Sequence, residues 1–140
     1  YAWKGGGAYL NGQSLQVSSV RSMEASFVVT ELPYNSEQYA RTGEYLIREL
    51  YGRVAGIRMN GSAAIALCYV AAGRFDAWLE AFLGKWDFSA AALIVQEAGG
   101  RVTDFYGNAG FIDGHHVVAT NGWLHPFLLE LVQKAMPLGM

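Results

Sequence analysis

The chain has 140 residues, of which 52% are hydrophobic and 16% are charged, and its net charge is −2. This length fits one domain with a core of its own, and this composition excludes an intrinsically disordered chain. The slightly acidic balance argues against a nucleic-acid partner. The longest apolar run, residues 63–72, falls well short of the roughly 20 residues that cross a membrane, so no membrane partner is expected.

The cysteine content and the first residue bear on location and length. A single cysteine, Cys68, excludes an internal disulfide and is typical of a reducing compartment, so we expect a cytoplasmic protein. The sequence opens on Tyr1 instead of methionine and enters a strand-like segment at once. We therefore expect the natural chain to be longer than 140 residues.

The first third of the chain predicts a hairpin, a buried strand and an amphipathic helix. Asn-Gly at 11–12 separates two strand-like runs, 8–10 and 14–17, and both residues tolerate the positive φ of a tight turn. Residues 26–30 (SFVVT) are mostly apolar and β-branched, which indicates a buried strand. Residues 36–52 carry apolar side chains at helical spacing with charges between them, as a helix covering a sheet would.

The middle third predicts a strand, a helix and a second strand. Residues 56–59 form a short strand, and 62–72 form a helix with Ser62 as N-cap and Gly73 at its end. That helix has no polar face, so we expect it to be buried between layers. Residues 74–81 alternate as a strand does. The alternation places Asp76, Trp78 and Glu80 on one face, and Phe75, Ala77 and Leu79 on the other.

The last third predicts a second apolar helix over 87–98, closed by Gly99-Gly100, then strands at Val102 and over 117–120. A final helix follows an Asn121 cap. Its apolar stripe comprises Leu124, Phe127, Leu128, Leu131, Val132 and Ala135. Strands alternating with helices predict an α/β fold, a layered sandwich of helices and a mixed, partly parallel sheet, in one domain over 1–140.

Three segments could carry chemistry, and each also has a structural interpretation. Asp87 at a helix start is either an N-cap or a ligand for a hard metal ion. Gly61, Ser62 and Ala63 either form an ordinary serine cap or leave the helix amides open to an anion or a hydroxyl-rich substrate. Glu80 is either a solvated residue at a strand end or a site residue. Taken singly, these segments leave the function undecided.

In their order along the chain, these segments resemble the inositol monophosphatase family. Residues 86–100 (WDFSAAALIVQEAGG) are similar to its C-terminal signature, in which WD precedes an apolar run and EAGG. Further similar segments are GIR at 56–58, GSAA at 61–64, CYVAAG at 68–73, GAYLNG at 7–12, VTE at 29–31 and ATN at 119–121. The resemblance covers nearly the whole chain and implies the C-terminal half of a sugar-phosphatase fold.

The resemblance implies a magnesium-dependent, lithium-sensitive phosphomonoesterase that hydrolyses inositol 1-phosphate or a related sugar phosphate with a metal-activated water. It implies that Asp87 is a ligand of Mg²⁺, that Gly61, Ser62 and Ala63 contact the substrate, and that Glu80 accepts hydrogen bonds from substrate hydroxyls. Fructose 1,6-bisphosphate and adenosine 3′,5′-bisphosphate stay open as substrates, and a homodimer is expected.

The family's N-terminal motifs have no counterpart in this sequence. Those motifs are an acidic pair and a DP-[IL]-DGT segment, which supplies two aspartates and the catalytic threonine, whereas the Asp-Gly of this chain is Asp113-Gly114, followed by two histidines. One carboxylate cannot hold the metal cluster of two-metal catalysis. We therefore expect a C-terminal half without the N-terminal metal-binding half, with no catalytic residue of its own and inactive alone. The alternative is a non-catalytic interaction module that associates with a second chain or with itself.

Overall fold

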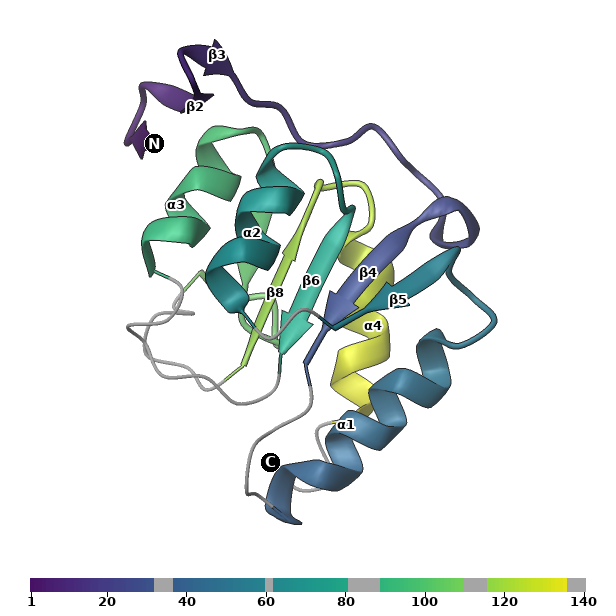
Figure 1. Ribbon diagram of the computed structural model, residues 1–140. Coiled ribbons are helices and arrows are strands. Elements are labelled where there is room, and N and C mark those ends of the chain that lie inside the picture. The colour runs from purple at the N-terminus through teal and green to yellow at the C-terminus, as the bar shows by residue number, and fades with distance from the viewer. Residues whose placement is uncertain (32–36, 60–61, 81–88, 110–115, 136–140) are drawn as a thin grey trace.

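The computed structural model describes residues 1–31, 37–59, 62–80, 89–109 and 116–135. Its centre is a sheet of five strands in the order β5-β4-β6-β8-β7 (Figure 1). The strands are β4 (Phe27–Thr30), β5 (Gly56–Arg58), β6 (Ala77–Glu80), β7 (Arg101–Thr103) and β8 (Val117–Thr120). Strand β4 pairs in parallel with β5 and β6, whereas β8 pairs antiparallel with β6 and β7. The expected mixed, partly parallel sheet is confirmed.

The described residues form four α-helices, two on each face of this sheet (Figure 1). Helices α2 (Ala63–Ala71) and α3 (Ser89–Glu97) share one buried cluster with Val29 and Trp78. Helices α1 (Glu37–Leu50) and α4 (His125–Ala135) share the other with Val28 and Leu79. Neighbouring residues of one strand point to opposite faces, and each face is closed by its own pair of helices. The layered α/β sandwich is thus confirmed. In the described ranges, no helix is long and apolar enough to span a membrane.

Strand β6 shows the predicted alternation within its own bounds. Trp78 lies in the cluster under α2 and α3, whereas Ala77 and Leu79 lie in the cluster under α1 and α4. The prediction is wrong for Phe75, which packs against the same cluster as Trp78. The reason is that Phe75 precedes the first residue of β6, where the backbone has not yet taken up the strand alternation.

A small antiparallel sheet at the N-terminus lies against α3. Its strands are β1 (Ala2–Trp3), β2 (Gly7–Leu10) and β3 (Gln13–Ser14), and a 3-10 turn, η1 (Met23–Ala25), precedes β4. The predicted hairpin turn is confirmed, because Asn11 and Gly12 have φ values of 51° and 78° between β2 and β3. The predicted second strand over 14–17 is wrong, since β3 ends at Ser14. The Gly7 amide donates to Glu97 Oε1 of α3 at 2.9 Å. This bond ties the small sheet to the helix layer.

Helix α2 begins and ends where the sequence predicts, but its burial differs. Ser62 Oγ accepts a hydrogen bond from the Ile65 amide at 3.3 Å, and Gly73 follows the helix with a φ of 76°. The prediction that the helix is buried all round is wrong, since Ile65 is 51% and Tyr69 is 36% exposed. The buried side, facing the sheet and α3, consists of Ala66, Leu67, Val70 and Ala71.

Asn121 Oδ1 accepts from the Leu124 amide at 3.2 Å, but this bond lies in the turn before α4, whose first residue is His125. The predicted helix start is therefore too early, since the helix begins four residues after the predicted cap. Leu128, Leu131 and Val132 of its apolar stripe are buried. Phe127 is 53% exposed, so its predicted place in the buried stripe is wrong. The predicted start of the preceding apolar helix, residues 87 and 88, lies outside the described residues.

Candidate functional site

The candidate site is the edge of the central sheet at which the parallel strands end. Strands β4, β5 and β6 all run toward this edge, and α2 begins beside it (Figure 1). In open α/β sheets, ligands bind outside the carboxyl ends of the strands, because loops and helix N-termini converge there. We call this the carboxyl edge and define it by Glu31, Met59, Ser62, Ala63 and Glu80.

The start of α2 combines a capped turn with small side chains. Ser62 has extended backbone angles, φ −139° and ψ 115°, and its carbonyl accepts from the Ala66 amide at 3.1 Å. The first amides of an α-helix have no partner within the helix, and they lie at the positive end of its dipole. Ala63 is small and half-buried, so an anionic or hydroxyl group can approach these amides. Ser62 can therefore cap α2 while the first amides of the helix stay open to a substrate group. Gly61 lies outside the described residues.

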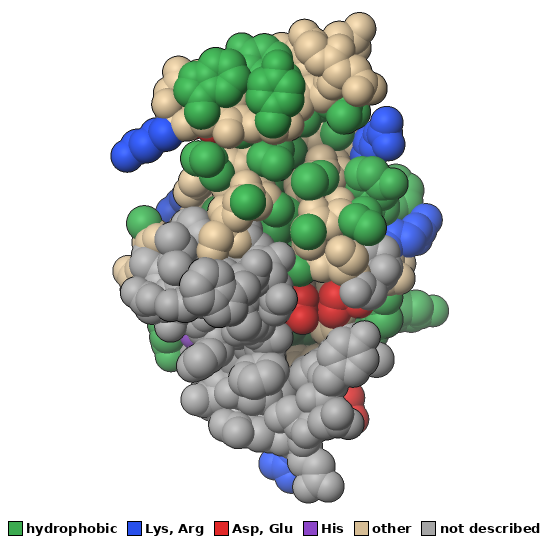
Figure 2. Space-filling model, turned by 60° about the vertical axis from the view of Figure 1, so that its left-hand side comes forward, with side chains coloured by type: hydrophobic (Ala, Val, Ile, Leu, Met, Phe, Trp, Pro, Cys, Tyr) green, Lys and Arg blue, Asp and Glu red, His purple; other side chains and the backbone are tan. Residues whose placement is uncertain are grey.

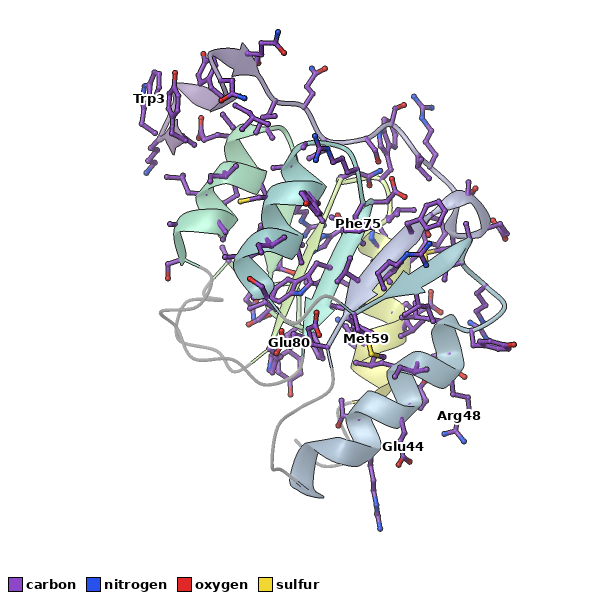
Figure 3. The ribbon with its side chains drawn as sticks, viewed as in Figure 1. Trp3, Glu44, Arg48, Met59, Phe75 and Glu80 are labelled. Carbon is purple, nitrogen blue, oxygen red and sulfur yellow. The ribbon has the colours of Figure 1, made fainter. Side chains whose placement is uncertain are left out.

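Glu80 is the last residue of β6 and is half-buried, so it is not a fully solvated side chain. Its backbone pairs with Val117 of β8. Figure 3 shows Glu80 and Met59 at the same end of the sheet, where β6 and β5 finish. Strand β4 lies between these two strands. The fold thus brings together Ser62, Ala63 and Glu80, which were proposed from sequence.

Glu31, for which no site role is predicted from sequence, lies at the same edge of the sheet. The last registered pair of β4 and β6 is Thr30 with Leu79, so Glu31 and Glu80 are the next residues along two neighbouring strands. The available signal was an acidic residue directly after a buried strand. That signal becomes informative only when the order and the direction of the strands are known.

The donor chemistry of this edge suits magnesium, but the described residues do not complete a metal site. Carboxylate oxygens are the ligands that Mg²⁺ prefers in proteins, and Glu31 and Glu80 supply such groups. Within the described ranges, no three His, Cys, Asp or Glu side chains come together to hold a metal ion. Asp87, the predicted metal ligand, lies outside these ranges.

Two buried polar residues elsewhere in the chain are occupied by structural bonds. Asp76 is 4% exposed, accepts from the Phe27 amide at 2.7 Å through Oδ2, and accepts from the Ser18 hydroxyl through Oδ1. It joins β4 to the start of β6 and the segment before η1. Because its bonds lie at the opposite end of β6 from Glu80, it is not part of the carboxyl edge.

His125 is fully buried between α4 and the sheet. Its Nε2 lies 2.8 Å from Thr103 Oγ1, and its Nδ1 lies 2.9 Å from Thr120 Oγ1. Burial, with a smaller effect from the charge of Arg101, lowers the pKa of His125 to about 4. A neutral imidazole with both nitrogens engaged fastens α4 to β7 and β8, and it is not placed to act on a ligand.

Comparison with known proteins relates this geometry to one family. The sequence matches the model of the inositol monophosphatase family over residues 1–136. Nus factor SuhB of Pseudomonas aeruginosa is 44% identical over 138 residues, which are 97% of this chain and 51% of that protein. Inositol-1-monophosphatase of Rhizobium meliloti is 38% identical, again over 97% of this chain and 51% of that protein.

Solved structures show the same relationship. The extragenic suppressor protein suhB from Bartonella henselae aligns with a TM-score of 0.89 at 35% identity, covering 95% of this chain and 51% of that one. The Thermotoga maritima IMPase aligns with a TM-score of 0.86 at 33% identity, covering 97% and 51%. The chain therefore spans about half the length of the relatives that it matches.

Proposed function

The chain belongs to the inositol monophosphatase family, and from that membership we propose that it provides the substrate-binding edge of a magnesium-dependent phosphomonoesterase. The substrate class is inositol 1-phosphate or a related sugar phosphate. One observation carries the proposal: the half-buried carboxylate of Glu80 and the first turn of α2 lie at the same edge of the sheet. A carboxylate accepts hydrogen bonds, whereas helix amides donate them, so this edge is suited to a molecule with both hydroxyl and anionic groups.

Each protein group would act on a different part of the substrate. Glu80 would accept hydrogen bonds from ring hydroxyls, and charge-assisted bonds of this kind are roughly twice as strong as neutral ones. The amides at Ala63, with the Gly61 and Ser62 segment before them, would donate to an oxygen of the substrate. Held at two points, the substrate would be oriented before reaction, which removes part of the entropic barrier.

We assign Asp87 as the ligand that this chain contributes to Mg²⁺. When bound, Mg²⁺ would neutralise charge on the phosphoryl oxygens and lower the pKa of a coordinated water. Asp87 would hold the ion through a carboxylate oxygen, and Glu80 would fix the leaving alcohol relative to it. We also propose that lithium inhibits this phosphatase activity.

We further propose that residues 1–140 form one domain that does not hydrolyse phosphate esters by itself. A two-metal site needs several carboxylates, and the proposal draws a single one, Asp87, from this chain. The stretch also covers 51% of the length of the relatives described above. The remaining ligands would come from outside these 140 residues.

The test is release of inorganic phosphate from inositol 1-phosphate in the presence of Mg²⁺. It compares the 140-residue chain with the complete gene product that contains it. We expect the complete product to be active and the 140-residue chain to be inactive. Strong activity of the 140-residue chain alone would refute the assignment of its metal ligands. A complete product that is inactive on every sugar phosphate tried would refute the enzymatic proposal.

A second candidate function is a non-catalytic interaction module, for which the uncovered side of α2 is the specific observation. Ile65 and Tyr69 are large apolar side chains exposed there, and such surface is commonly covered by another chain. Relatives named Nus factor SuhB make a role as a Nus factor one form of this candidate. We also propose self-association and, from Cys68 alone, a cytoplasmic location. Light scattering that gave a monodisperse monomer would count against the module.

A further inference from the structure

The turn between β1 and β2 contains three successive glycines, and a carboxylate from α3 lies against it. The Gly7 amide donates to Glu97 Oε1 at 2.9 Å, although the two residues are 90 positions apart in sequence. We propose that this glycine turn, Gly5 to Gly7, is a carboxylate-binding nest, and that Glu97 in it is a latch that holds the β1–β2 hairpin closed on α3. Figure 1 shows this hairpin at the end of the molecule away from the carboxyl edge.

The backbone of the glycine turn is suited to an anion. Gly5 and Gly7 have φ values of 78° and 85°, a left-handed conformation that glycine adopts without strain. Successive amides in turns with left-handed residues form concave sites that bind anions. The amides of Gly7 and Gly5, and to a smaller extent that of Gly6, hold the pKa of the Glu97 carboxyl below its ordinary value, and the charge of Lys4 acts in the same direction. The turn therefore favours the ionised carboxylate.

Aromatic rings cover the glycine turn on the side away from α3. The Gly6 amide donates to the Trp3 carbonyl at 2.9 Å, and a β-carbon added to Gly6 would lie 1.7 Å from Trp3 Nε1. A β-carbon added to Gly7 would lie 3.3 Å from the Tyr9 hydroxyl oxygen. The rings of Trp3 and Tyr9 stack with their centroids 5.6 Å apart. Figure 2 shows hydrophobic side chains gathered over this sheet at the top of the molecule. The turn thus has room for glycine alone at Gly6, and its amides are left for the carboxylate.

The apolar contacts between the hairpin and α3 are small, so the polar contact matters for its position. Ala2 and Ala8 are the hairpin residues that pack in the cluster shared with α3, and a methyl group buries little apolar area. Hydrogen bonds to an ionised carboxylate are roughly twice as strong as neutral ones. Farther along the chain, the Val17 amide donates to the Ala98 carbonyl at 3.1 Å. Because that bond fixes the segment after β3, we expect loss of the Glu97 contact to open only the hairpin before it.

The test measures local opening in the complete gene product, without substrate, by hydrogen exchange over residues 1–10 and by tryptic cleavage after Lys4. Lys4 is exposed and directly precedes the glycine turn. In Glu97→Ala, which removes the carboxylate, both rates should rise by about tenfold or more, as for loss of a hydrogen bond to a charged group. The matched control is Glu44→Ala, at an exposed position of α1 (Figure 3). Its rates should stay within about twofold of wild type.

Sodium formate distinguishes a carboxylate-binding nest from an ordinary packing contact. In Glu97→Ala, formate should occupy the glycine turn and restore slow exchange and slow cleavage, with a saturable dependence on its concentration. Sodium chloride at the same concentrations should not restore them. The wild type should not respond to formate, because its turn already holds a carboxylate. If Glu97→Ala fails to fold, Glu97→Gln replaces it. That variant keeps one acceptor oxygen without the charge, so both rates should rise by about threefold, and unchanged rates would overturn the latch.

The outcomes test the latch and the nest separately. Rates in Glu97→Ala that equal those of the wild type would overturn the latch. So would faster exchange spread equally over the central sheet, since this would be a loss of global stability instead of local opening. Opening confined to residues 1–10 that formate does not reverse would overturn the nest as a carboxylate site. None of these measurements involves hydrolysis, so their results are independent of the proposed function.

Discussion

Replacing His125 with glutamine tests whether the fold depends on a neutral buried histidine. The imidazole joins Thr103 and Thr120, on the two strands next to α4, and it is fully buried. Protonation would place a positive charge in this buried site, where the partners of the imidazole are two uncharged threonine hydroxyls. The structure accordingly lowers the pKa from 6.5 to about 4, chiefly through burial.

The size and the sign of the effect follow from that shift. Between the folded pKa of about 4 and the unfolded value of 6.5, the unfolded chain binds the proton and the folded chain does not. The free energy of unfolding therefore falls as the pH is lowered through this window. At about 1.4 kcal/mol per pKa unit, the loss between about pH 7 and pH 4.5 amounts to about 2 kcal/mol from this residue.

The assay is urea unfolding followed by tryptophan fluorescence at both pH values, for the wild type and His125→Gln. The variant should be less stable near pH 7 by about 1–2 kcal/mol, because glutamine cannot replace both hydrogen bonds. Its further loss at the lower pH should be smaller than that of the wild type by about 2 kcal/mol, since glutamine does not titrate. The carboxyl groups titrate in both proteins, so their contribution to the change in the free energy of unfolding cancels when the two proteins are compared. Equal losses in the two proteins would refute the reasoning.

Four further substitutions test the site and the core. Glu80→Gln in the complete gene product should lower kcat/KM for inositol 1-phosphate by about tenfold or more with an unchanged circular dichroism spectrum; unchanged kinetics would remove Glu80 from the site. Gly100→Ala should cost about 3 kcal/mol in urea unfolding, because the new methyl would lie 2.5 Å from the Thr120 carbonyl oxygen. Gly122→Ala, with open space but a φ of 92°, should cost only about 1 kcal/mol, and equal losses would contradict the clash. Leu128→Ala should cost about 2–5 kcal/mol, since Leu128 is fully buried under the sheet; a loss below about 1 kcal/mol would show that α4 packs loosely.

Features determined by neighbouring residues were predictable from sequence. The Asn11-Gly12 turn needs two residues that tolerate positive φ, and the structure gives both of them positive φ. The Ser62 cap and Gly73 likewise follow from the local chemistry of helix ends. Because strands and helices alternate along the chain, the α/β fold class could also be predicted from sequence.

Features that depend on distant segments were not predictable. A helix apolar on every side gives no periodicity that separates Ile65, which is exposed, from Leu67, which is buried. Phe127 fits the spacing of the α4 stripe, yet it lies at the edge of that stripe and is exposed. Glu31 could not be paired with Glu80 because 49 positions separate them in sequence, and only the register of β4 and β6 brings them together.

The most direct test of the central claim is the magnesium dependence of inositol 1-phosphate hydrolysis in the complete gene product, compared between wild type and Asp87→Asn. Asparagine keeps the size of the side chain and can still cap a helix, but it removes the charge that would hold the ion. The account predicts that wild-type activity requires Mg²⁺ and is abolished by a chelator. It predicts that Asp87→Asn loses at least about a hundredfold in activity and needs more Mg²⁺ for what remains. The account would be contradicted if Asp87→Asn were as active as the wild type and needed no more Mg²⁺.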